Sequence, residues 1–432
     1  MGTIKNTETS RIPARRGLLA LSPMVVFLLL YVVESVSLGD FYKMPISVAL
    51  VAASIWAIAI YRRPLMDRIE TFSRAAGHSN ILYMIWIFVL AGAFASIAKE
   101  IGAIDATVDL ALRIFPPYLI VPTLFLAACF ISLAVGTSVG TVVALAPLAQ
   151  QLAVTSGGNV AYFVAAVLGG AFFGDNLSFI SDTTIAATRS QGCGMADKFK
   201  TNLWIALPAA IVTLVLYSVN SSGSSAIEVP HDSNPWMMLP YLVVIVTAVT
   251  GINVTIVLSL GIAASLLLGL IAGYPLIDMA QYAGAGIAGM GDLIVITLLA
   301  SGMLGIIKAA GGIQYLLQGL TTRIHGCRGA QAVLALLVGL VNLCTANNTV
   351  AIITVGGISR DISQRYGIDP RKSASLLDSA SCVVQCLIPY GAQTLLAASL
   401  VGISPAAPFP YLYYPWALAA MIILSILIRR RR

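Results

Sequence analysis

The stretch GDNLSFISDTT, residues 174–184, interrupts a long apolar run over residues 160–188 and decides the fold. It places the carboxylates of Asp175 and Asp182 seven residues apart, which is about two helical turns, so both lie on one face if the segment stays helical. A carboxylate at membrane depth is costly and by default marks a route for ions or protons. The stretch therefore predicts a polar break, and an ion site, within a membrane-spanning segment.

The composition places this stretch in a membrane protein. Of 432 residues, 58% are hydrophobic and 10% are charged, whereas soluble domains average about 25% charged residues. Apolar runs of about 18 residues or more recur along most of the chain, and each is long enough to cross a bilayer as a helix. These runs lack the polar–apolar alternation of β-barrel strands. We therefore expect an all-α polytopic protein embedded in the lipid bilayer.

The apolar runs fall into two groups around a Ser-rich polar stretch at residues 220–234. We predict spans at residues 18–38, 45–61, 81–98, 117–135, 141–155, 160–188 and 201–219, and then at 236–250, 254–272, 291–309, 330–345, 347–358, 376–402 and 411–428. Residues 1–219 form the first predicted transmembrane repeat, 220–235 an extracytoplasmic linker, and 236–432 the second repeat.

The basic residues, which give the chain a net charge of +7, predict its orientation. They gather in the N-terminal segment, in the segments 61–74, 189–200, 321–328 and 359–372, and in the tail Arg429–Arg432. With the spans above, all of these lie on one side of the membrane and the linker lies on the other. Positive residues favour the cytoplasmic side, so we expect a bacterial cytoplasmic (inner) membrane protein with both termini in the cytoplasm. This distribution gives no support for nucleic-acid binding.

The two groups of spans resemble each other. Residues 90–99 resemble residues 299–308 at an offset of 209, and near that offset the polar break at 136–141 falls on 344–349, and residues 179–182 fall on 387–390. With the topology above, the matched spans cross in opposite directions. Such inverted repeats, here of about 5–7 membrane segments each, are typical of secondary transporters whose sites lie at broken helices or re-entrant hairpins.

Further polar breaks supply candidate ligands. GTSVGT at 136–141 and TANNT at 345–349 offer hydroxyl and amide oxygens from Thr137, Ser138, Asn347, Asn348 and Thr349. Unwound turns also expose carbonyls and helix ends, which suit a cation or polar solute near the midplane. A simple helix kink is the alternative. A fourth break holds Asp378 and, further on, Pro389, which frees an upstream carbonyl.

The acidic residues have both functional and structural interpretations. Burial favours the protonated form of a carboxylate, while a bound cation favours the ionised form, so sodium and a proton can compete for one group. Alternatively, Asp182 caps a half-helix or pairs with Arg189, and Asp378 serves as a cap near the cytoplasmic end. Lys99 and Lys308 could pair with such carboxylates, although extension to the membrane interface explains them more simply.

The sequence gives little support for enzyme chemistry. It contains no GxxxxGK[ST], HExxH or GxSxG motif. Its six cysteines form no CxxC pair, and its three histidines lie in predicted loops, so we expect no metal set and no cofactor. The expected ligands are the coupling ions, sodium and protons.

The breaks resemble signatures of the NhaC family of sodium/proton antiporters over residues 81–428. Residues 174–184 resemble its GD…SPxSDTT element, residues 136–141 its GTSxGT element, and Asp378-Ser379 with residues 387–390 its EDS and IPW stretches. Phe179 stands where that signature has Pro, and Tyr390 stands where Trp is common. The resemblance implies that one side of a transport site holds Asp175, Ser178, Asp182, Thr183 and Thr184, and that the opposite side holds Thr137, Ser138 and Asn347 to Thr349.

Our hypothesis is sodium/proton antiport by alternating access, with Asp182 and Asp175 binding sodium and a proton in turn. Relatives of the family exchange malate for lactate or move amino acids. The alternative is therefore a sodium- or proton-coupled transporter of amino acids or small carboxylates, in which Asn347 and Asn348 help to hold the solute. A homodimer is consistent with either function.

Overall fold

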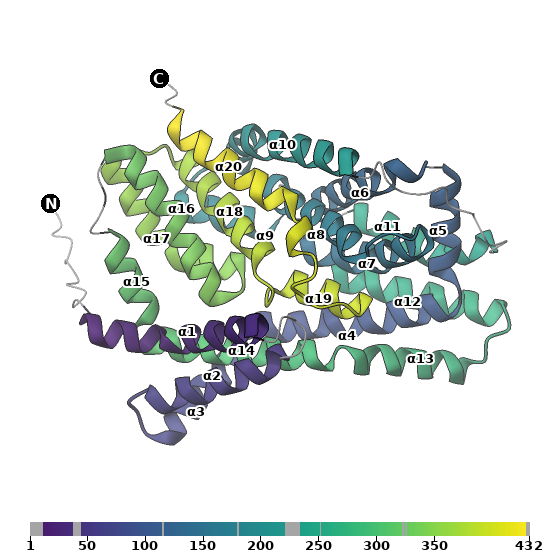
Figure 1. The fold of residues 1–432 in the computed structure, drawn as a ribbon, viewed down its shortest axis with the longest axis horizontal. Helices are drawn as coiled ribbons and strands as arrows, with labels where there is room; N and C mark the ends of the chain where they lie inside the picture. The colour runs from purple at the N-terminus through teal and green to yellow at the C-terminus, as the bar shows by residue number, and fades with distance from the viewer. Residues whose placement is uncertain are drawn as a thin grey trace. The chain divides into compact units, whose positions relative to one another are not determined.

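The computed structural model describes residues 12–37, 45–114, 116–178, 181–220, 234–250, 252–321, 324 and 326–428. These residues form twenty α-helices and three short 3-10 helices, and contain no strand (Figure 1). The all-α prediction is confirmed. Most of the predicted linker (221–233), Lys5 and Arg11 of the N-terminal segment, Arg323 and the tail Arg429–Arg432 lie outside the described residues.

The chain divides into two compact units, which we describe separately. Unit 1 comprises residues 1–78 and 298–325, and unit 2 comprises residues 79–297 and 326–432. This division follows compactness and not internal similarity, so the predicted repeat boundaries at 219 and 236 remain predictions.

Unit 1 is built from the first three helices and a returning segment of chain. Its helices are α1 (Ala14–Ser37), α2 (Ile46–Ile60), α3 (Leu65–Ala76), the later part of α14 (Gly291–Ala309) and α15 (Gly312–Thr321). Helix α1 packs on α2 and α15. The Trp56 indole donates to Ser22 Oγ at 2.8 Å, which ties α2 to α1.

Unit 2 contains most of the chain. Its helices are α4 (Ser79–Glu100), α5 (Ala103–Ile114), α6 (Ile120–Val135), α7 (Ser138–Thr155), α8 (Val160–Leu177), α9 (Asp182–Gln191), α10 (Met195–Asn220), α11 (Leu239–Val249), α12 (Val254–Ile271), α13 (Leu276–Gly289), α16 (Gly326–Thr345), α17 (Asn348–Tyr366), α18 (Pro370–Leu387), α19 (Ala392–Val401) and α20 (Tyr413–Leu427). The 3-10 helices η1 (Pro117–Leu119), η2 (Pro235–Met238) and η3 (Phe409–Tyr411) precede α6, α11 and α20.

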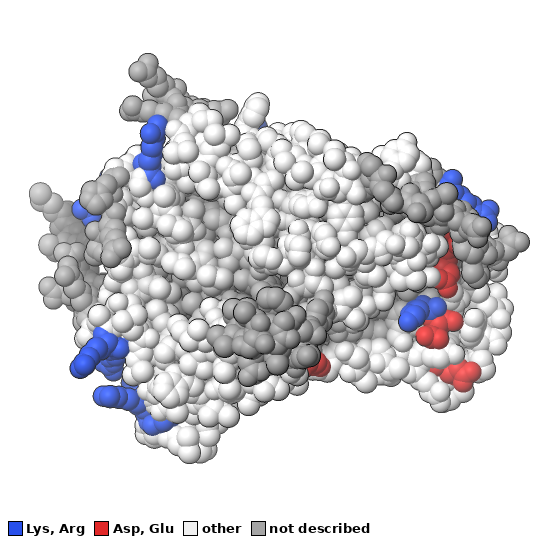
Figure 2. Space-filling view, in the orientation of Figure 1, with Lys and Arg blue, Asp and Glu red and all other residues white. Residues whose placement is uncertain are grey.

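The helices have the length and composition of membrane spans. Eight segments of the described chain are long and apolar enough to cross a bilayer. Large apolar side chains such as Trp204, Leu267 and Ile277 are exposed on α10, α12 and α13. Broad areas of the face in Figure 2 carry neither basic nor acidic residues. Such a surface suits lipid rather than water, and the chain is an integral membrane protein.

Several helices depart from the predicted spans. The spans predicted over 160–188 and 376–402 are each broken, because α8 ends at Leu177 before α9 begins, and α18 ends at Leu387 before α19 begins. Helices α3, α5, α13 and α15 lie where no span was predicted. Helices α3 and α5 are short and carry charged residues, so hydropathy alone does not reveal them.

The predicted loops 189–200 and 359–372 are largely helical, so their assignment as loops was wrong. Helix α17 continues to Tyr366, and α18 already begins at Pro370. Arg360 and Arg365 therefore lie on α17, and Lys198 lies in the first turn of α10. Charged residues near a span end were assigned to loops because their sequence context does not distinguish a loop from the polar first or last turn of a helix.

The positions at which four helices begin or end recur at a constant interval later in the chain. Helices α6 to α9 begin or end at Val135, Ser138, Leu177 and Asp182, and α16 to α19 do so at Thr345, Asn348, Leu387 and Ala392, 210 residues later in each case. In this register Asp175 corresponds to Gln385, whereas the sequence alignment used an offset of 208 at this point. The inversion of the two halves across the membrane remains a prediction.

Close packing of α6 on α8 positions the end of α8. A Cβ atom on Gly170 would lie 2.5 Å from Ala128 Cβ, and one on Gly174 would lie 2.1 Å from Ser132 Oγ. Small residues permit this close approach of two helices. The Ser132 hydroxyl also donates to the Ala171 carbonyl at 2.5 Å. The residue after Gly174 is Asp175, so this contact fixes the backbone that carries the buried carboxylate.

We expect Gly174→Ala to destabilise the protein. The new methyl group would lie 2.4 Å from the main-chain carbon of Ser132, so the α6 or α8 backbone would have to move. Overpacking of this kind costs about 1–3 kcal/mol. Thermal unfolding in detergent measures the loss. Gly357→Ala on α17, where a Cβ meets nothing within 4 Å, is the control and should melt like the wild type. Equal melting temperatures for the two variants would contradict the packing argument.

Candidate functional site

Two helix breaks with the same backbone geometry frame the site. Between α6 and α7, Gly136 has φ 73° and Thr137 is extended at φ −145° and ψ 126°. Between α16 and α17, Ala346 has φ 47° and Asn347 is extended at φ −149° and ψ 110°. The interruptions predicted at 136–141 and 345–349 are therefore real changes in backbone direction. Among the described residues, Ala346 is the one non-glycine residue with a positive φ.

Asp175 lies in the last turn of α8 and is 4% exposed. The backbone N–H of Ser138 donates to its Oδ1 atom at 3.1 Å. Ser138 is the first residue of α7, where N–H groups lack helical partners and the helix dipole is positive. The break before α7 therefore directs a favourable end of a helix at a buried carboxylate.

A chain of hydrogen bonds joins this carboxylate region to the second break. Gln393 Nε2 on α19 donates to Ser138 Oγ at 3.0 Å, and Gln385 Nε2 on α18 donates to Gln393 Oε1 at 3.0 Å. Gln385 Nε2 also donates to the Ala346 carbonyl at 3.0 Å. Residues of both predicted repeats therefore contribute to one buried network.

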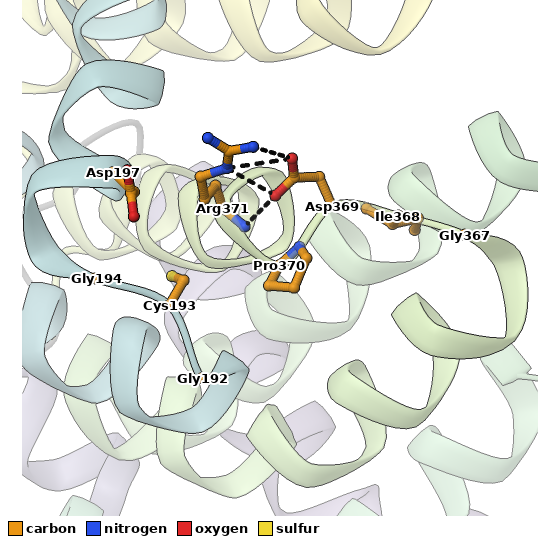
Figure 3. A pocket seen from close by; sticks show the side chains of 9 residues that line it. All are labelled: Gly192, Cys193, Gly194, Asp197, Gly367, Ile368, Asp369, Pro370 and Arg371. Atoms are coloured by element: carbon orange, nitrogen blue, oxygen red, sulfur yellow. Dashed lines mark hydrogen bonds and ion pairs between the residues drawn. The ribbon is translucent and has the colours of Figure 1, made fainter. Parts of the chain in front are cut away.

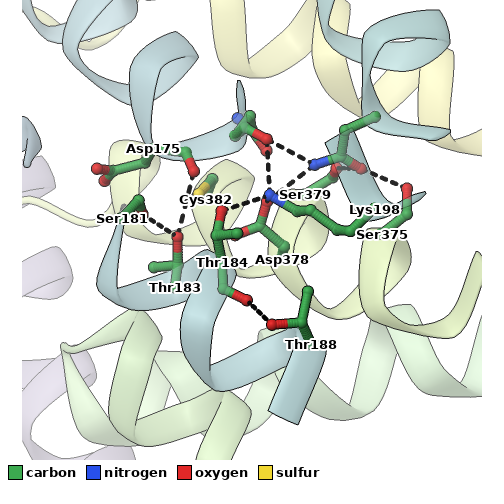
Figure 4. A network of polar contacts seen from close by, with 12 residues as sticks. Asp175, Ser181, Thr183, Thr184, Thr188, Lys198, Ser375, Asp378, Ser379 and Cys382 are labelled. Atoms are coloured by element: carbon green, nitrogen blue, oxygen red, sulfur yellow. Dashed lines mark hydrogen bonds and ion pairs between the residues drawn. The ribbon is translucent and has the colours of Figure 1, made fainter. Parts of the chain in front are cut away.

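A second buried carboxylate has a cationic partner. Asp378 on α18 and Lys198 on α10 are both 0% exposed, and Lys198 Nζ lies 2.6 Å from Asp378 Oδ2 (Figure 4). Lys198 Nζ also donates to the Asn176 carbonyl and to Thr184 Oγ1, each at 2.7 Å. Asn202 Nδ2 donates to Asp378 Oδ2 at 2.9 Å. Asp378 is therefore held as half of an ion pair.

The α8–α9 break separates the two acidic residues that the sequence paired. Asp182 is the first residue of α9 and its side chain is exposed, whereas Asp175 is buried. The argument from two turns of continuous helix does not apply, because α8 ends at Leu177. The side chain of Asp182 is therefore more accessible than that of Asp175.

The remaining residues of this break are buried beside Asp175. Thr183 Oγ1 lies 2.7 Å from Ser181 Oγ and donates to the Asp175 carbonyl at 3.3 Å (Figure 4). Thr184 is the hydroxyl ligand of Lys198, and Ser178, the cap of α8, is 2% exposed. The structure thus brings Ser178, Thr183 and Thr184 close to the two buried carboxylates, and their part in a transport site remains a prediction.

The second break uses its polar side chains mainly to begin α17. Asn347 Oδ1 accepts from the Val350 N–H at 3.0 Å, which caps the helix. Asn348 is buried and its Nδ2 lies 3.8 Å from Cys382 Sγ, while Thr349 and Thr137 are half-buried. Capping occupies Asn347 Oδ1, although this alone does not prevent the residue from contacting a solute.

Several polar residues of the network are not among the site residues predicted from the sequence. Lys198 was assigned to a loop, and Lys99 and Lys308, which were considered as partners for buried carboxylates, are exposed. Asn202, Gln385 and Gln393 lie inside predicted spans. An amide side chain inside an apolar span is a usable signal, because a polar group at membrane depth needs a partner.

Several buried oxygen atoms remain available as acceptors. In the described part of the chain, Asn176 Oδ1, Asn342 Oδ1, Gln385 Oε1 and Thr394 Oγ1 have no hydrogen-bond partner. Carboxylate, amide and hydroxyl oxygens are the ligands that hard cations prefer. No group of three His, Cys, Asp or Glu residues suited to a metal ion occurs among the residues searched.

A pocket of about 600 Å³ lies between two connecting segments of unit 2 (Figure 3). Its lining is Gly192, Cys193, Gly194, Asp197, Gly367, Ile368, Asp369, Pro370 and Arg371. Arg371 forms an ion pair with Asp369 at 2.9 Å. Asp197 directly precedes Lys198, so the pocket lies one residue along the chain from the buried ion pair.

Comparison with known proteins gives a consistent result. The model of the Na+/H+ antiporter family matches residues 19–221 and 227–429. The Na+/H+ antiporter NhaC of Bacillus subtilis (strain 168) is 24% identical to the chain, over 85% of this chain and 87% of that protein. The malate-2H+/Na+-lactate antiporter of the same organism is 21% identical, over 94% and 93%. The arginine/ornithine antiporter ArcD of Halobacterium salinarum is 23% identical, over 76% and 75%.

We predict that the thiol of Cys193, which lines this pocket, is unreactive. Burial raises the pKa of Cys193, the carboxylates of Asp197 and Asp369 raise it further, and Lys198 opposes them. Because the thiolate is the nucleophile, alkylation should remain slow at neutral pH. Asp197→Asn removes a negative charge, so the pKa should fall and half-maximal alkylation should occur at lower pH. Mass spectrometry of the Cys193 peptide after iodoacetamide treatment measures this shift. Asp361→Asn, outside the pocket, is the control, and one common midpoint for all three proteins would contradict the argument.

Proposed function

The chain belongs to the Na+/H+ antiporter family, and we propose that it exchanges sodium ions for protons across a membrane with Asp175 as the exchanging carboxylate. It is a membrane antiporter and not an enzyme. The observation that carries the proposal is the contrast between Asp175 and Asp378, the two buried carboxylates beside the α8–α9 break. Asp378 is paired with Lys198 at 2.6 Å, whereas Asp175 is held by the neutral N–H of Ser138.

Sodium and a proton are alternative neutralising partners for Asp175. A buried carboxylate without a fixed counter-ion is costly, so it favours whichever cation is available. The hydroxyl groups of Ser138 and Thr183 and the buried amide oxygens of Asn176 and Gln385 are candidates to complete an oxygen shell for sodium. No cofactor is needed for this exchange.

The other predicted residues have supporting roles in the proposal. Asp182 remains a second sodium ligand, and its exposure at the start of α9 suits it to attracting cations from water. Ser178 and Thr184 shape the α8–α9 break. Thr137, Asn347, Asn348 and Thr349 shape the two breaks opposite it.

Alternating access would use the two halves of the chain. The matched segments of the family model begin 208 residues apart, at residues 19 and 227, and the helix ends of α6 to α9 recur in α16 to α19. These correspondences support two repeats, which we propose to have inverted topology. Motion of one half against the other would then expose Asp175 to each side in turn.

We place the protein in the bacterial cytoplasmic membrane with both termini in the cytoplasm, on the basis of its basic segments. The pocket of Figure 3 lies between the α9–α10 and α17–α18 connections, both on the proposed cytoplasmic side. It is therefore our candidate cytoplasmic vestibule. A homodimer is compatible with this arrangement.

Asp175→Asn should abolish exchange. The amide keeps the size of the side chain but cannot alternate between binding a proton and a cation. We expect a sodium pulse to move protons in proteoliposomes that contain the wild type and a pH-sensitive dye, and to have no effect above empty vesicles with the variant. Asp182→Asn should retain exchange with a weaker apparent affinity for sodium, and Asp361→Asn, exposed on α17, should behave as wild type. Sodium-driven proton movement by Asp175→Asn would refute the assignment.

The alternative is transport of an amino acid or a small carboxylate, as the names of two relatives suggest. A basic residue that binds a solute carboxylate needs free N–H donors. An ammonium has three such donors, and Lys198 directs hydrogen bonds to three protein oxygens. Lys198 is therefore poorly suited to hold a solute carboxylate in this conformation, and the alternative depends on Asn347 and Asn348.

The same vesicles discriminate between the two functions. Under the antiport proposal, malate, lactate, arginine and ornithine leave the sodium-driven proton movement unchanged. Proton movement that begins only after one of these solutes is added would assign the protein to solute transport.

A further inference from the structure

Lys198 is surrounded by oxygen ligands of the kind that bind a free cation. Its ammonium is 0% exposed and lies within 2.7 Å of a main-chain carbonyl, a hydroxyl and a carboxylate. These oxygens belong to Asn176 on α8, Thr184 on α9 and Asp378 on α18. We call this set of three the Lys198 cage.

The α8–α9 break creates one ligand of the cage. Helix α8 ends at Leu177, so the carbonyl of Asn176 belongs to the last turn, where carbonyls lack helical partners. The C-terminal end of a helix carries a partial negative charge and favours cations. The Lys198 ammonium and the Asn202 amide, at 2.8 Å, both donate to this carbonyl.

The remaining contacts hold two of the three cage oxygens, those of Asn176 and Asp378, in place. Asn202 Nδ2 donates to the Asn176 carbonyl and to Asp378 Oδ2, and Asn202 Oδ1 accepts from the hydroxyls of Ser375 and Ser379. All of these residues are 0% exposed. These two oxygens therefore have reason to remain in place when the ammonium is removed.

We propose that the Lys198 ammonium is a tethered cation occupying a monovalent-cation site, and that this site binds a free monovalent cation when the lysine side chain is removed. The consequence for transport rests on the proposed function. Because Lys198 neutralises Asp378, Asp175 is the carboxylate of this buried network left to exchange sodium and protons. The existence of the cage does not depend on that function.

The test uses the purified full-length chain in detergent. Asp175→Asn is the background, so that sodium binding at the proposed transport site does not contribute. In Asp175→Asn/Lys198→Ala, the melting temperature should rise saturably with sodium or potassium chloride relative to choline chloride at equal concentration. A ligand that binds only the folded state stabilises it in this way. Propylammonium, which carries the atoms that Lys198→Ala removes, should also raise the melting temperature.

Two matched proteins complete the test. Asp175→Asn, with Lys198 in place, should show no such response, because the cage is filled. Asp175→Asn/Lys198→Ala/Asp378→Asn removes both charges of the pair, so it should fold without leaving an unpaired buried charge and should lose the response.

Either of two results would overturn the proposal. One is a folded Asp175→Asn/Lys198→Ala protein that melts at the same temperature in sodium, potassium, propylammonium and choline. The other is that this variant fails to fold in cells, whereas the protein that also carries Asp378→Asn folds. Because potassium is abundant in cells, that result would mean that the cage had failed to bind a free cation. Neither result bears on ion flux, so failure here is distinct from failure of the antiport proposal.

Discussion

Main-chain groups at a helix break inside a membrane must find partners within the protein, and this constraint organises the core of unit 2. At the break before α7, the Ser138 N–H finds the Asp175 carboxylate. At the end of α8, the Asn176 carbonyl finds Lys198 and Asn202. At the break before α17, the Ala346 carbonyl finds Gln385. Asp175, Lys198 and Gln385 thus each satisfy part of the broken backbone as well as lining the core.

The same constraint separates the roles of Asp175 and Asp378, the two buried carboxylates of the site. The carbonyl end of α8 attracts a cation, and Lys198 supplies one that also pairs with Asp378. The amide end of α7 attracts an anion, and Asp175 supplies it. Helix ends of opposite polarity therefore create an anionic site without a fixed counter-ion beside a site whose counter-ion is built into the chain. That asymmetry is the physical basis for assigning exchange to Asp175.

Much of this arrangement could be predicted from sequence, because helix breaks have local causes. Gly136, Asn347 and the residues after Leu177 interrupt apolar runs with glycine or polar side chains, and the structure breaks helices at these positions. The different exposures of the Asp175 and Asp182 side chains could not be predicted in the same way. Their one-face geometry assumed a continuous helix, and the break leaves one carboxylate buried and the other exposed.

Lys198 shows why the rest could not be predicted. A lysine beside a span end is ordinarily interfacial, and nothing in residues 189–200 indicates burial. Its burial depends on Asp378, which lies in another helix far along the chain, and on the unpaired end of α8. The roles of Gln385 and Gln393 could not be predicted for the same reason. Both residues link parts of the chain that only the fold brings together.

The most direct test of the account is proton release on sodium binding by the purified protein, followed with a pH indicator in weakly buffered detergent solution. If Asp175 exchanges a proton for sodium, sodium should release protons from the wild type and from Asp182→Asn but not from Asp175→Asn. Proton release that persists in Asp175→Asn would show that another group performs the exchange, and would contradict the account.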